Sequence, residues 1–92
     1  MEAVERKKEH EEIFNNVRQI LESIVRDTRT PRNIRRAATD SIDVLNDESR
    51  SYGTRANIVT NILEEISTDL NMPSTTRTKI WAALSMLEKV RD

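Results

Sequence analysis

Apolar residues recur every three or four positions along most of the chain, which is the spacing of a helix with one buried face. The first such stripe follows a charged head and contains Ile13, Phe14, Val17, Ile20, Leu21, Ile24 and Val25. It predicts a helix over about residues 3–26, whose first three turns have no apolar face. Oppositely charged side chains four positions apart favour a projecting helical extension over residues 1–12, and fraying is the alternative.

A second helix is predicted to start at Thr30-Pro31, with the threonine as its cap and the proline at its first position. Proline fits there because its missing N–H would have no helical partner. The apolar stripe that follows ends near Asn46 and consists of Ile34, Ala37, Ala38, Ser41, Ile42 and Leu45.

The third and fourth helices follow the same rules. Residues 47–54 form a polar connection in which Ser51 and Thr54 both fit the cap of helix three. Its predicted buried face contains Ala56, Val59, Ile62, Leu63 and Ile66, with Leu70 as a further candidate. Met72-Pro73 repeats the start led by proline, and the fourth stripe consists of Ile80, Ala83, Leu84, Leu87 and Val90.

Short connections make consecutive helices antiparallel neighbours, so we predict an all-α, up-and-down four-helix bundle. The chain is one helical domain, 1–92, with a charged extension (1–12), a first hairpin (13–46) and a second hairpin (47–92). The hairpins look like two copies of one unit, because Asp27, Pro31 and Arg35 recur as Asp69, Pro73 and Arg77. A two-repeat solenoid fragment, or a dimer that completes the stack, is the alternative.

Aspartate and arginine recur at one separation in all three connections, as Asp27 and Arg35, Asp47 and Arg55, and Asp69 and Arg77. Aspartate is favoured near the free N–H groups of a helix start. Arginine one turn into a helix can reach back and hold the connection by forked hydrogen bonds. We therefore predict structural turn clamps at Asp27, Pro31, Arg35, Asp69, Pro73 and Arg77, with ligand binding by the arginines as the alternative.

Three stretches resemble a small archaeal family known as uncharacterised protein family 0147. They are Pro31-Arg32-Asn33-Ile34-Arg35, Asn71-Met72-Pro73 and Arg77-Thr78 followed by Ile80-Trp81, and the resemblance covers about residues 13–90. It implies a compact four-helix fold and an archaeal cytoplasm, and it supplies no catalytic residue. Leucine and histidine are common in that family after the second proline, where this chain has Ser74 and Thr75.

The composition argues against an enzyme. The chain has no cysteine, which removes disulfides and thiolate metal sites, and its one histidine, His10, lies in the charged head. We predict that His10 is a solvated surface residue. A single histidine, with Lys7 three positions before it, provides no Glu-x-x-His motif and makes a Ser–His arrangement not credible. Pairs of neighbouring carboxylates are expected to be solvated. We predict a non-enzymatic protein without cofactor or metal.

Five arginines crowd residues 26–36, although the chain has a net charge of −1 and 34% charged residues. Arg29, Arg32 and Arg36 are the candidate contacts for weak binding of nucleic acid or another polyanion. The acidic residues that follow, with Asp40 four positions after Arg36, and the lack of interleaved aromatic residues argue against this function.

Protein–protein contact is the leading prediction. Trp81 lies at the edge of its apolar stripe, one turn after Arg77, whose guanidinium can stack on the indole. A lone tryptophan there is usually a core or boundary residue, and an exposed one near Met86 or Tyr52 would anchor an interface. We therefore predict a scaffold module that binds a protein partner or itself through Trp81, Arg77 and Tyr52. Without an apolar run long enough for a membrane or a signal peptide, we expect it in the cytoplasm.

Overall fold

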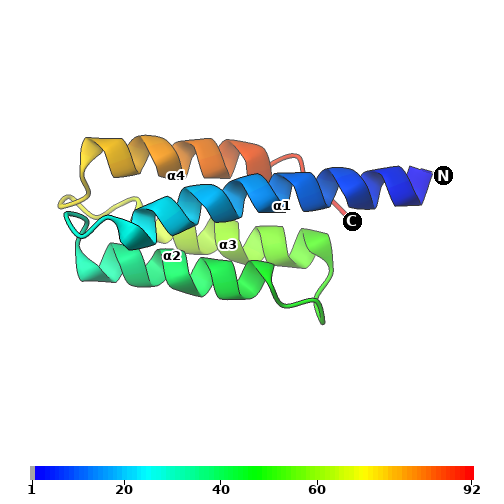
Figure 1. Ribbon diagram of the computed structural model, residues 1–92, viewed down its shortest axis with the longest axis horizontal. Helices are drawn as coiled ribbons and strands as arrows, with labels where there is room; N and C mark the ends of the chain where they lie inside the picture. Colours follow the sequence, from blue (N-terminus) through cyan, green and yellow to red (C-terminus); the bar gives the residue numbers. More distant parts are fainter. Residues whose placement is uncertain (1) are drawn as a thin grey trace.

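The computed structural model describes residues 2–92, with side chains from residue 4 onward. Four helices make up the fold: α1 (Glu2–Arg26), α2 (Arg32–Leu45), α3 (Tyr52–Ile66) and α4 (Ser74–Leu87) (Figure 1). The predicted all-α bundle is confirmed, and the helix bounds lie within a few residues of those expected. No helix in this part of the chain is long and apolar enough to span a membrane.

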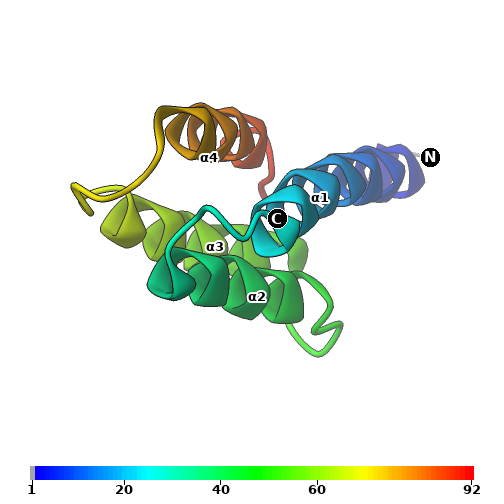
Figure 2. The same ribbon diagram turned by 60° about the vertical axis from the view of Figure 1, so that its left-hand side comes forward.

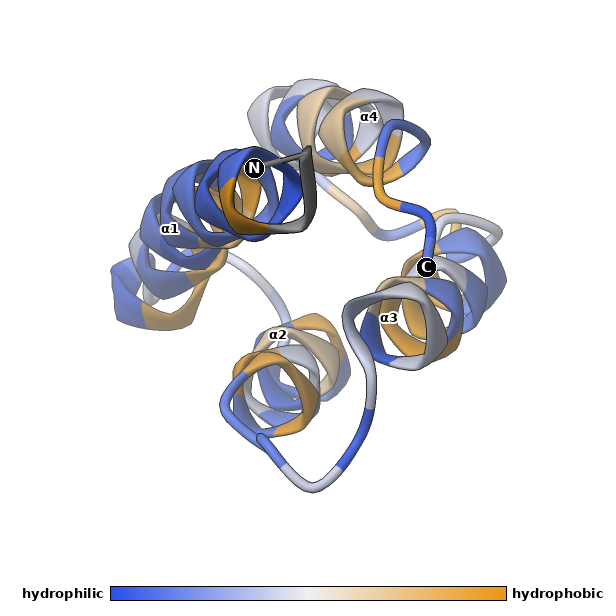
Figure 3. Ribbon diagram, turned by 90° about the vertical axis from the view of Figure 1, so that its right-hand side faces the viewer, coloured by the Kyte–Doolittle hydropathy of each residue, from blue (hydrophilic) through white to orange (hydrophobic). Residues whose placement is uncertain are grey.

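The helices run up and down around one core. Viewed along the bundle, α1 lies beside α2 and α4, while α3 occupies the opposite corner (Figure 3). α1 extends past the ends of its neighbours, so that its first turns project from the bundle (Figures 1 and 2). That the two hairpins are copies of one unit stays a prediction.

The core contains the apolar stripes that the spacing predicted. α1 supplies Phe14, Val17, Leu21 and Ile24, and the other three helices face them with Ile34, Ala38, Leu45, Ala56, Val59, Leu63, Ile80, Ala83 and Leu87. Burying one large apolar side chain stabilises the fold by about 1.5–3 kcal/mol. Small residues at Ala38 and Ala83 leave room for neighbouring helices to approach closely.

His10 is buried, with only 6% of its surface exposed, so its predicted solvation is wrong. It lies one helical turn before Phe14 and therefore continues the buried face of α1 into the charged head. Its ring packs against Tyr52, at the start of α3, with the ring centres 5.2 Å apart. Part of the head thus has a core contact that the apolar pattern alone does not reveal.

The starts of the helices also differ in detail from the prediction. Pro31 and Pro73 occupy the cap positions of α2 and α4, so each helix begins one residue later than predicted. In neither helix does a side chain of the cap residue accept a hydrogen bond. Thr30 is not the cap of α2, because its buried hydroxyl shares a hydrogen bond of 3.1 Å with Thr76 instead. Ser51 caps α3, where its hydroxyl accepts a hydrogen bond from the Thr54 N–H.

Leu70 is not part of the buried face of α3. The helix ends at Ile66, and Leu70 lies in the connection to α4 with 95% of its surface exposed.

Candidate functional site

The three connections between helices contain the same kind of turn. The carboxylates of Asp27, Asp47 and Asp69 each accept a hydrogen bond from the backbone N–H two residues later, at 3.0, 3.1 and 2.8 Å. Each aspartate carbonyl accepts a second bond from the N–H three residues later. An aspartate that satisfies the following N–H groups in this way forms a tight turn. The helix cap then follows four residues after each aspartate.

The paired arginines hold the connections through backbone carbonyls. Arg77 donates to the carbonyls of Ser67 (2.6 Å) and Asp69 (3.1 Å), and Arg35 donates to Thr30 (3.0 Å). Arg55 donates to the Leu45 carbonyl at 2.9 Å, at the end of α2. Hydrogen bonds from a charged donor are about twice as strong as neutral ones. These guanidinium groups are therefore occupied within the fold.

Hydrogen bonds lower the pKa of all three turn aspartates below the ordinary value. The chief donors are the Arg29 side chain for Asp27, the Ser49 hydroxyl for Asp47 and the Asn33 amide for Asp69. Because the ionised form is favoured in the folded state, these groups stabilise the fold above the ordinary aspartate pKa of about 4. The contribution is lost as the pH falls through the lower folded pKa.

We expect Asp69→Asn to lower the free energy of unfolding at pH 7. The difference from the unsubstituted protein should shrink at an acidic pH below the lowered pKa of Asp69, where Asp69 itself takes up a proton. Urea unfolding followed by circular dichroism at both pH values checks this result. Glu64→Gln is the matched control, because the exposed Glu64 side chain makes no hydrogen bond or ion pair with the described residues. A difference for Asp69→Asn that does not change with pH would contradict the prediction.

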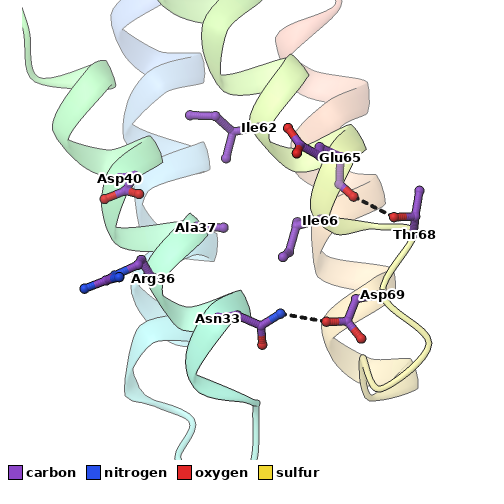
Figure 4. Close-up of a pocket in the computed structure, with 9 residues that line it drawn as sticks. All are labelled: Asn33, Arg36, Ala37, Asp40, Ile62, Glu65, Ile66, Thr68 and Asp69. Carbon is purple, nitrogen blue, oxygen red and sulfur yellow. Dashed lines mark hydrogen bonds between the residues drawn. The ribbon is translucent and has the colours of Figure 1, made fainter.

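The basic stretch is less available to a polyanion than its sequence suggests. Arg29 pairs with Asp27 (3.1 Å) and Arg26 with Glu22 (4.0 Å), while Arg35 holds the connection. Arg32 and Arg36 are exposed, and the Arg36 side chain extends away from α3 (Figure 4). The polyanion function stays a prediction. Of its three candidate contacts, Arg32 and Arg36 form no ion pair with the described residues, whereas Arg29 does.

A shallow groove of about 500 Å³ lies between α2 and α3. Ala37, Ile62 and Ile66 form its apolar floor, and Asn33 crosses one end to donate to Asp69 at 2.7 Å (Figure 4). This bond ties the start of α2 to the connection after α3. The groove can accept an apolar side chain, and the Thr68 hydroxyl at its edge donates to the Glu65 backbone carbonyl rather than to a carboxylate.

The predicted interface residues do not lie together as one cluster. Trp81 is 62% exposed on α4, so its assignment to the core or boundary is wrong and the alternative of an exposed indole holds. Arg77 directs its guanidinium to the Ser67 and Asp69 carbonyls. Tyr52 is half-buried and donates its hydroxyl to Glu11 at 2.6 Å. Trp81 is thus the candidate anchor that remains accessible.

Among the described residues, no three His, Cys, Asp or Glu side chains are placed to hold a metal ion. The exposed indole of Trp81 and the α2–α3 groove are features that suit binding. The spacing of apolar residues did not predict the contact of His10 with Tyr52, because histidine is polar and was not counted in the apolar stripe of α1.

The comparisons with known proteins agree with this architecture. The family model described as "Uncharacterised protein family (UPF0147)" matches residues 1–90. The chain belongs to this family. A UPF0147 protein of Sulfurisphaera tokodaii is 58% identical over 73 residues, which cover 79% of this chain and 82% of that protein. A UPF0147 protein of Thermococcus kodakarensis is 53% identical over 81 residues, which cover 87% and 98% of the two chains.

The solved structure of a UPF0147 protein from Thermoplasma acidophilum has the same fold, with a TM-score of 0.85 and 31% identity. The alignment covers 91% of this chain and 99% of that one. The predicted resemblance to this archaeal family is confirmed, and the match extends through the charged head that the resemblance had left out. UPF0147 is a family of unknown function, and the function of this member is likewise unknown.

Proposed function

We propose that this UPF0147 protein is a non-enzymatic cytoplasmic module that binds a protein, or a second copy of itself, through the face of α4 that carries Trp81. The observation that carries the proposal is the exposure of Trp81 on a rigid helix of a bundle whose other large aromatic residues are packed. Tryptophan is among the residues that most often dominate binding energy at protein interfaces. Its indole is large and apolar and loses little conformational entropy on binding.

The surroundings of Trp81 support an interface rather than a reaction centre. Leu84, three positions after Trp81 on the same helix, is half-buried and adds apolar surface on the Trp81 side of α4. The single histidine, His10, packs against Tyr52 and forms no hydrogen bond with a serine of the described chain. A module of this kind acts by presenting a preformed surface, so that little conformational entropy is lost on binding.

Trp81→Ala is expected to weaken binding by at least about 2 kcal/mol while leaving the bundle folded. Light scattering over a concentration series measures self-association, and pull-downs from archaeal extract with wild-type and variant baits measure partner binding. Because Trp81 is the only tryptophan, its fluorescence should shift to shorter wavelength when a partner covers the indole.

Leu70→Ala is the matched control, because it also removes an exposed large apolar side chain but lies in the connection before α4. The proposal requires that Leu70→Ala binds like wild type. A strictly monomeric protein whose pull-down is the same with the Trp81→Ala bait would contradict it.

A further inference from the structure

Both sides of the α2–α3 groove carry an exposed carboxylate. Asp40 on α2 and Glu65 on α3 line the groove across its apolar floor (Figure 4), and neither belongs to an ion pair found among the described residues. A third carboxylate at one end, Asp69, accepts the hydrogen bond from Asn33. Among the described residues that line the groove, Arg36 is the one cation, and its side chain extends away from α3. An apolar residue with cations beside it is therefore the complement of this groove.

The charged head of α1, described from residue 4 to residue 12, presents such a surface. Val4 is followed three and four positions later by Lys7 and Lys8, which places the three residues on one side of the helix. Val4 is 73% exposed, and neither lysine forms an ion pair with the described residues. The exposed glutamates of the head lie on a different side: Glu5, Glu9 and Glu12. The head thus offers an exposed valine with two lysines one turn away.

A chain cannot place its own head in its own groove. The head lies at the end of the bundle where α3 starts, since Tyr52 donates a hydrogen bond to Glu11, and it projects past that end (Figure 1). Ile62, in the groove floor, lies about 15 Å along α3 from Tyr52, toward the opposite end of the bundle. A contact between head and groove therefore requires two copies of the chain.

We propose that the α2–α3 groove binds the charged head of a second copy of this chain. The valine of the head lies on the apolar floor, and its two lysines pair with Asp40 and Glu65. A helix that lays its apolar side into a groove is a recurring mode of recognition between proteins. Opposite charges beside the floor set the register of the helix and disfavour other partners. In a two-fold dimer each head lies in the groove of the other copy, so the contact forms twice.

This contact is separate from the proposed interface on α4, so it is tested in full-length protein that carries Trp81→Ala. The groove variant adds Asp40→Lys and Glu65→Lys, and the head variant adds Lys7→Glu and Lys8→Glu. Sedimentation velocity over a concentration series measures self-association, at low ionic strength because salt screens exposed charges. The Trp81→Ala protein should dimerise. Each charge-reversed variant should dimerise at least about tenfold more weakly, because like charges then meet in both contacts.

A mixture of the two variants separates this contact from a general loss of association. Equal amounts of groove variant and head variant should associate as tightly as the Trp81→Ala protein, since each head then meets a groove of opposite charge. Asp43→Lys with Glu64→Lys is the matched control, because both residues are exposed on the same two helices but do not line the groove. This control has the net charge of the groove variant and keeps an acidic groove. Its mixture with the head variant should therefore associate more weakly.

Three results would overturn the proposal. The first is a Trp81→Ala protein that stays monomeric up to about 1 mM. The second is a groove variant that dimerises like the Trp81→Ala protein, and the third is a control mixture that associates as tightly as the mixture of groove and head variants. Circular dichroism checks that each variant is folded, as expected for substitutions at exposed positions. Because every protein compared lacks the indole, none of these results depends on the interface proposed at Trp81.

Discussion

Replacing Arg55 with alanine is expected to lower the free energy of unfolding by about 3 kcal/mol, because three contacts are lost together. Only 4% of Arg55 is exposed, and its guanidinium donates to the Leu45 carbonyl at 2.9 Å. The guanidinium also lies over two aromatic rings, 4.5 Å from the centre of Tyr52 and 5.1 Å from that of Phe14. This single side chain therefore links the end of α2, the start of α3 and the buried face of α1.

The magnitude follows from adding the separate contacts. A hydrogen bond to a charged group contributes about 1.5–3 kcal/mol. Stacking on an aromatic ring adds about 0.5–2 kcal/mol, with the larger values where water is excluded. The buried stem of the arginine contributes packing as well. Arg55→Lys should recover only part of the loss, because an ammonium group cannot donate in a fork or stack flat on a ring.

Arg50→Ala is the matched control from the same connection. Arg50 is exposed and pairs only with Asp47, at 3.1 Å, and an exposed ion pair contributes at most about 1 kcal/mol. Urea unfolding of the three variants measures the difference. If Arg55→Ala and Arg50→Ala unfold at the same urea concentration, Arg55 does not clamp the connection. The hydrogen bonds of the paired arginines would then not be what stabilises the three connections.

Much of the fold could be predicted because its determinants are local in sequence. The 3–4 spacing of apolar residues gave the four buried faces, and the two prolines marked the starts of α2 and α4 to within a residue. The recurring pair of aspartate and arginine indicated the turns, although not that the guanidinium groups bind backbone carbonyls. These features depend on neighbours within about ten residues along the chain.

The contacts that were missed depend on segments far apart in sequence. His10 is buried because Tyr52 lies against it, and Asp92 reaches Gly53 from the segment after α4. Leu70 fits the apolar spacing of α3, but the helix ends earlier, at Ile66. Helical periodicity carries no information about where a helix meets a distant partner, so polar residues in the core and residues past a helix end were assigned wrongly.

The hydrogen bond between Thr30 and Thr76 predicts a large coupling between two substitutions. The two hydroxyls lie 3.1 Å apart and both residues are almost fully buried, with 1% and 2% of their surfaces exposed. Their bond joins the connection before α2 to the first turn of α4. In the repeat that the sequence predicts, Thr30 and Thr76 correspond to the apolar residues Met72 and Ile34.

Thr30→Val or Thr76→Val alone should lower the free energy of unfolding by about 1–3 kcal/mol, because each leaves the other hydroxyl buried without a partner. The double variant should unfold with nearly the wild-type free energy, since valine has the shape of threonine and no polar group then remains unpaired. The coupling between the two substitutions should reach about 1–3 kcal/mol in a double-mutant cycle measured by urea unfolding. Thr78→Val, at an exposed position of α4, should change stability by less than about 0.5 kcal/mol. Additive losses in the double variant would show that the two hydroxyls do not depend on each other, and that this end of the bundle is held by apolar packing alone.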